Sequence, residues 1–82
     1  MEENIIVILN FLKTGQQLDI QVPLWISANE LVIGINEAYG LEIDTLDYSK
    51  CYLKAENPVA FLRGNKKLSE FGLRNGSIIN IL

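Results

Sequence analysis

The sequence predicts an α+β fold in which one main helix packs on one face of a mixed sheet of four to five strands. Three observations lead to this prediction: a glycine turn between two apolar runs at the start, one capped amphipathic helix, and a short apolar run at the end. The chain has 82 residues, of which 49% are hydrophobic and 21% charged. This size and composition are typical of a single folded domain, residues 1–82.

An opening β-hairpin is predicted first. Residues 4–12 consist mostly of Ile, Val, Leu and Phe, which favours a strand. Gly15 allows a tight turn within residues 13–17, and apolar residues then alternate with polar ones through residues 17–22. Pro23 ends this second strand because proline has no N–H to donate to a sheet.

The next element is one helix that begins at Ala28. Ser27 and Glu30 have the spacing of a capping box, and Gly40 stands where a left-handed C-terminal cap is expected. Apolar residues recur at intervals of three and four: Leu31, Ile35, Ala38 and Tyr39. Gly34, inside the helix, is interpreted as a point of close packing between helix and sheet. Trp25, just before the helix, is expected to be a hydrophobic staple rather than an exposed interface anchor.

The second half of the chain predicts three further strands. The expected elements are a strand at 50–56, a turn at Asn57-Pro58, a short strand at 59–62, one helical turn within 66–73, a turn at Asn75-Gly76 and a last strand at 77–82. A helix over one face of such a sheet forms a two-layer domain. By analogy of fold, laying the last strand parallel to the first completes a β-grasp arrangement.

These elements resemble those of ubiquitin-like domains. In residues 60–82, "AFLRGNKKLSEFGLRNGSIINIL", a strand, a basic turn, a Leu-Ser helical turn and a final strand follow in the same order as in ubiquitin. Two segments, "FLKTGQQLDIQVP" and "LSEFGLRNGSIINIL", further resemble the first hairpin and the terminal segment of the YukD/EsaB family. Members of that family are ubiquitin-like cytoplasmic proteins associated with type VII secretion in Gram-positive bacteria.

This resemblance implies a function. We expect a non-enzymatic accessory or regulatory protein of a type VII secretion system that binds protein subunits of the secretion apparatus. A free-standing ubiquitin-like adaptor of another bacterial pathway is the alternative, and a processed protein modifier or sulfur carrier is a third reading. Conjugated relatives carry a terminal Gly-Gly tail, whereas this sequence ends at Leu82 without one, so we expect no conjugation.

Composition argues against several other functions. The net charge of −3 does not suit a protein that binds nucleic acid through its phosphates. The chain has no His and one cysteine, Cys51, so we expect no catalytic site, cofactor or metal site, and Cys51 is expected to be a buried small hydrophobe. The apolar run near the N-terminus is too short for membrane insertion, which favours a cytoplasmic protein.

Charged residues form two groups whose role stays open between solvated surface and partner steering. The basic group contains Arg63, Lys66, Lys67 and Arg74, and the acidic group contains Glu37, Glu42, Asp44 and Asp47.

The candidate binding site is the sheet face that the helix leaves open. The first strand keeps Asn10 out of the core if its inward residues are Ile5, Val7, Leu9 and Phe11. The other residues of that strand then face outward. The same alternation points Cys51, Leu53, Ile79 and Ile81 inward. The apolar residues predicted on the outer face are Ile6, Ile8, Tyr52, Ile78 and Leu82. An apolar outer face predicts a surface for a partner or a homodimer, unless Leu24 and Trp25 or another register cover it.

Overall fold

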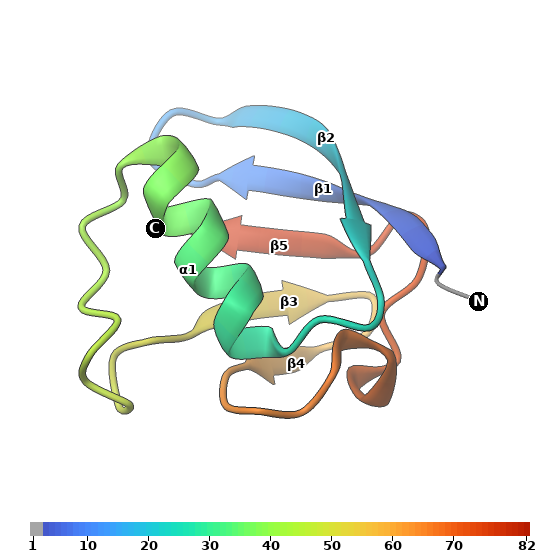
Figure 1. Cartoon of the computed structure of the whole chain (residues 1–82). Coiled ribbons are helices and arrows are strands. Elements are labelled where there is room, and N and C mark those ends of the chain that lie inside the picture. Colours follow the sequence, from blue (N-terminus) through green and yellow to red (C-terminus); the bar gives the residue numbers. More distant parts are fainter. Residues whose placement is uncertain (1–2) are drawn as a thin grey trace.

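Five strands and one α-helix form two layers in the part of the chain that the computed structural model describes, residues 3–82 (Figure 1). Met1 and Glu2 belong to the predicted domain and lie outside the described residues. The elements are β1 Asn4–Phe11, β2 Gln16–Pro23, α1 Ala28–Tyr39, β3 Leu53–Glu56, β4 Ala60–Leu62, a short 3-10 helix at Leu68–Phe71, and β5 Ile78–Ile81. This order confirms the predicted α+β fold.

The strands form one mixed sheet in the order β2-β1-β5-β3-β4. β5 lies beside β1 in parallel, with Ile8 opposite Ile78, and the other neighbouring strands are antiparallel. The predicted pairing of the last strand with the first is therefore confirmed, and the sheet has the β-grasp arrangement.

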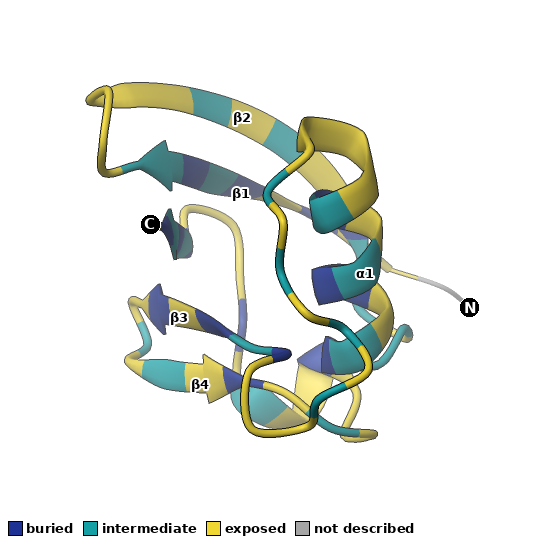
Figure 2. Cartoon of the chain, turned by 90° about the vertical axis from the view of Figure 1, so that its left-hand side faces the viewer, coloured by how far each residue is buried: buried dark blue, intermediate teal, exposed yellow. Residues whose placement is uncertain are grey.

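Side chains alternate along the central strands as the apolar pattern predicts. Val7 and Leu9 of β1 and Ile79 of β5 are fully buried beneath α1, whereas Ile6 is 43% exposed on the other face. The two-residue period of a strand produces this alternation. Figure 2 shows buried residues interspersed with more exposed ones along β1 and β3, and buried residues on α1.

The capping box of α1 is present as predicted. The Glu30 backbone N–H donates to Ser27 Oγ at 3.1 Å, and the Ser27 N–H donates to Glu30 Oε1 at 3.0 Å. At the other end Gly40 adopts a φ of 61°, in the left-handed region that glycine adopts without strain. The sheet-facing side of the helix buries Leu31 and Ile35.

Two interpretations near the helix are wrong. A Cβ on Gly34 would have no heavy atom within 4 Å, so close packing against the sheet does not require this glycine. A glycine in a helix interior costs about 1 kcal/mol relative to alanine, and the packing of the fold does not explain it. The staple position directly before the cap is held by Ile26, and Trp25 is 48% exposed.

The third strand is shorter than the predicted 50–56. The backbone N–H groups of Lys50 and Cys51 both donate to the Asp47 carbonyl at 2.9 Å, which makes a turn of the residues that precede β3. Cys51 is 2% exposed, which confirms its prediction as a buried residue. Burial raises the pKa of the Cys51 thiol, and the negative charge of Asp44 raises it further.

Candidate protein-binding site

The helix-free face of the sheet carries three isoleucines side by side. Ile8 of β1 and Ile78 of β5 are direct partners across the parallel pair, and Ile6 lies two residues before Ile8 on the same face. Ile6 is exposed, and the other two are partly buried by their neighbours. Three of the five predicted site residues thus come together, and we call Ile6, Ile8 and Ile78 the isoleucine cluster.

Acidic residues border the isoleucine cluster on both sides. Asp19 of β2 is opposite Ile8, and Glu56 of β3 is opposite Ile78. Side chains opposite each other on neighbouring strands share a face, so both carboxylates flank the apolar surface. A partner that covers the cluster would therefore meet a central apolar surface with negative charge at its sides.

A polar row separates the isoleucine cluster from the end of the sheet. Asn10 Nδ2 donates to Asn80 Oδ1 at 3.0 Å, and Asn80 Nδ2 donates to Glu56 Oε2 at 2.6 Å. Lys54 is the partner of Asn80 on β3, which continues the row. The predicted patch is therefore not one continuous apolar surface.

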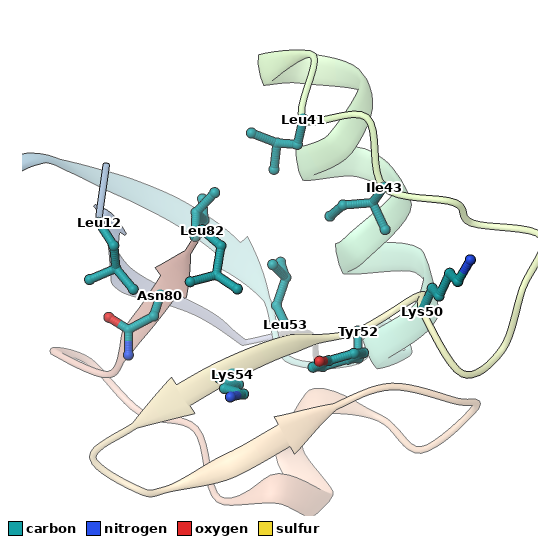
Figure 3. A pocket seen from close by; sticks show the side chains of 10 residues that line it. Leu12, Leu41, Ile43, Lys50, Tyr52, Leu53, Lys54, Asn80 and Leu82 are labelled. Atoms are coloured by element: carbon teal, nitrogen blue, oxygen red, sulfur yellow. The ribbon is translucent and has the colours of Figure 1, made fainter. Parts of the chain in front are cut away.

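Tyr52 and Leu82 lie beyond this row, at a pocket of about 330 Å³. Residues from the sheet and from the loop after α1 line it, and we call it the sheet-end pocket: Leu12, Leu41, Ile43, Tyr52, Lys54 and Leu82 are among them (Figure 3). Leu82 is 78% exposed, and Tyr52 is partly buried. The two remaining site residues thus belong to a second apolar area.

Aromatic contacts extend this second area onto β4. The rings of Tyr52 and Phe61 meet edge to face with centroids 5.7 Å apart, and Lys54 Nζ lies 5.7 Å from the Phe61 centroid. Phe61 is 58% exposed, and the site prediction missed it together with Leu12. The alternation that buries Leu62 would have placed Phe61 on the outer face.

Leu24 and Trp25, the residues considered as a cover for the helix-free face, lie just before the helix. Leu24 packs against the hydrophobic core, and the side chain of Trp25 is itself half exposed. The observed burial along β1 also agrees with the predicted inward side of that strand.

Several basic side chains of the late group have local contacts. Arg63 lies over the Tyr48 ring at 5.2 Å, and Lys66 lies over the Phe71 ring at 5.2 Å. The Arg74 guanidinium donates to Asn57 Oδ1 at 3.0 Å. Cation–π contacts and hydrogen bonds of this kind are ordinary features of a folded surface.

Residues 3–82 have neither a candidate metal site nor a helix that could span a membrane. They contain no group of three or more His, Cys, Asp or Glu residues that could hold a metal ion. No helix in the same residues has the length and apolar character needed to cross a membrane.

The family model described as "WXG100 protein secretion system (Wss), protein YukD" matches residues 6–81, which is nearly the whole chain. The chain belongs to the YukD family. Among curated proteins, no sequence match reaches significance. The family match confirms the resemblance in the first hairpin and the terminal segment.

A solved structure supports the fold of this YukD-family chain. It is a de novo designed protein based on ubiquitin, with a TM-score of 0.63 and 14% sequence identity. The similarity covers 94% of the YukD-family chain and 84% of the designed protein. The chain is thus a ubiquitin-like protein of the WXG100, or type VII, secretion system.

Proposed function

We propose that this protein is a non-enzymatic accessory or regulatory component of the secretion system that acts in the cytoplasm through non-covalent contacts with protein subunits of the apparatus. The observation that carries the proposal is the YukD match over residues 6–81. The alternative, an adaptor of another pathway, shares the same fold and predicts different partners.

The helix-free face supports protein contacts as the mode of action. It presents the isoleucine cluster, and the sheet-end pocket opens next to it at the end of the sheet. A sheet covered by one layer normally has a polar outer face, so exposed apolar side chains there favour a recognition surface. We assign the contact to Ile6, Ile8 and Ile78 together with Tyr52 and Leu82.

The division of this face allows the two areas to be tested separately. We would capture partners from native cytoplasm and membranes with the wild type, with Ile6→Ser and with Leu82→Ser. Both changes act on exposed side chains, so the fold is expected to survive. Loss of secretion-apparatus subunits with one variant would assign the contact to that area.

Leu46→Ser is the matched control, since Leu46 is 97% exposed in the loop after α1 and does not line the sheet-end pocket. Equal recovery by all variants would place the contact elsewhere. If the folded wild type captures no apparatus subunit, the secretion role is wrong and the adaptor role gains support.

Two further measurements complete the test. Light scattering over a range of concentrations determines whether the helix-free face forms a homodimer, and Ile6→Ser should then dissociate it. A denaturing immunoblot of cell extract detects covalent adducts. A ladder of adducts would contradict the non-covalent mode and favour a processed modifier.

A further inference from the structure

β2 is an edge strand with an open hydrogen-bonding side. It ends the strand order, and no other strand in the described residues pairs with its outer edge. The Leu24 N–H donates to the Glu3 carbonyl at 2.9 Å, which sets the alternation along the antiparallel pair. By that alternation the backbone N–H and C=O groups of Gln17, Asp19 and Gln21 point away from β1.

The two edges of the sheet differ in what they offer to another strand. β2 has eight residues, whereas β4 at the opposite edge has three. A short edge offers few main-chain bonds, and a long one can pair with a whole added strand. β2 is therefore the edge at which an added strand can form the larger number of main-chain hydrogen bonds.

An apolar groove of about 240 Å³ runs between β2 and α1. Side chains from both elements line it, including Ile20 and Val22 from β2 and Leu31, Ile35 and Ala38 from α1. The lining side chains of β2 point to the helix side of the sheet. An extended segment added to β2 would point every second side chain the same way, into this groove.

Gly34 forms part of the helix wall of the groove. Its Cβ position is open space, and its backbone is not in the positive-φ region that would require glycine. Packing and backbone geometry thus leave this unfavourable helix residue unexplained. The missing side chain does have one effect: it keeps the groove open along the middle of α1.

The charge around the groove is negative. Glu30 lines it, and Glu37 follows Gly34 by three residues on the exposed side of α1, where helical residues three apart are neighbours. No Lys or Arg is among the lining residues. This charge favours an occupant with Lys or Arg beside its apolar residues.

We propose that the β2–α1 groove is a second binding site, where an extended peptide segment of a partner protein adds as a strand to β2. Aliphatic side chains at alternate positions of the segment fill the groove beside Gly34, and Lys or Arg residues lie near Glu30 and Glu37. A second copy of this chain fits less well. Two antiparallel β2 strands centred on Asp19 would place like charges opposite each other.

The probe is a displayed library of random peptides of about 12 residues, long enough to cover the strand edge. Selection on the folded chain should enrich peptides with alternating aliphatic residues and flanking Lys or Arg. One selected peptide is then synthesised, and its affinity for the folded chain is measured by fluorescence anisotropy. No selected peptide, or selected peptides without this pattern, would overturn the proposal.

Gly34→Leu tests the groove itself. Leucine is a good helix former and its Cβ meets no atom, so the melting temperature should not fall while the affinity drops at least about tenfold. Gly34→Ala adds one methyl group as the size-graded control and should weaken binding much less. Equal affinity for wild type and Gly34→Leu would show that the peptide binds elsewhere.

N-methylated peptides test strand addition. Only every second backbone N–H of an added strand faces β2, so methylating one alternate set should abolish binding and methylating the other set should not. An equal effect of both sets would exclude pairing with the edge. None of these variants alters the helix-free face, so the outcome is independent of the proposed function.

Discussion

Asn10 on β1 and Asn80 on β5 are direct partners across the parallel strand pair, and their side-chain amides are joined by a hydrogen bond of 3.0 Å. Asn80 also donates to Glu56. Two asparagines in the centre of a sheet face satisfy each other and keep that face partly polar. They divide the isoleucine cluster from the sheet-end pocket.

Replacing Asn80 with leucine should join the two apolar areas. The variant loses both hydrogen bonds of the Asn80 side chain, and its helix-free face becomes a larger continuous apolar surface of the kind that promotes association. We expect a higher weight-average mass than for the wild type in light scattering, rising with concentration. Asn80→Thr keeps a polar group and is the control. A wild-type mass for Asn80→Leu would mean that the polar row does not limit association.

Gly34→Ala should stabilise the protein. The new methyl group meets no atom within 4 Å, and alanine is favoured over glycine in a helix interior by about 1 kcal/mol. For a domain of this size that corresponds to a rise in melting temperature of about 4–8 °C. Thermal unfolding followed by circular dichroism measures it. A fall in melting temperature would mean that the space beside Gly34 is needed by the fold.

Ile78 and Ile79 are neighbours in sequence with opposite environments. Ile79 is fully buried, so Ile79→Ala should lower the free energy of unfolding by about 2–5 kcal/mol. Ile78 is partly buried on the other face, so Ile78→Ala should lower the free energy of unfolding by only about 1 kcal/mol. Urea denaturation of both variants provides the comparison. Similar losses for the two would contradict the alternation of β5.

The Cys51 thiol should make stability depend on alkaline pH. Burial and the Asp44 charge raise its pKa in the folded state, so the folded chain holds its proton at pH values where the unfolded chain releases it. Below the unfolded pKa both states are protonated and stability is unaffected. Above about pH 8.5 ionisation of the thiol stabilises the unfolded state. The free energy of unfolding therefore falls as the pH rises, until the pKa of the thiol in the folded state is passed.

Cys51→Ala isolates this contribution, because Tyr and Lys side chains also titrate in alkaline solution. The difference in unfolding free energy between wild type and variant should shrink as pH rises from about 8 to 10. Urea titrations at several pH values, with a reductant present, measure it. A difference that is constant over this range would contradict the raised pKa.

Local signals in the sequence predicted most of the fold. The apolar alternation of β1 and β5 depends only on which neighbours share a face, and the Ser27–Glu30 capping box lies within one helical turn. The pairing of β1 with β5 came from resemblance to ubiquitin-like domains. Each of these features is specified by residues near one another or by a known arrangement of strands.

The sequence by itself determined the order of the elements and the inward side of each central strand, because short-range periodicity encodes both. Tertiary structure decided the rest. Asn10 and Asn80 are 70 residues apart, and only the register of β1 against β5 makes them partners and splits the predicted patch. The open space at Gly34 likewise depends on how α1 lies beside β2, which no local pattern specifies.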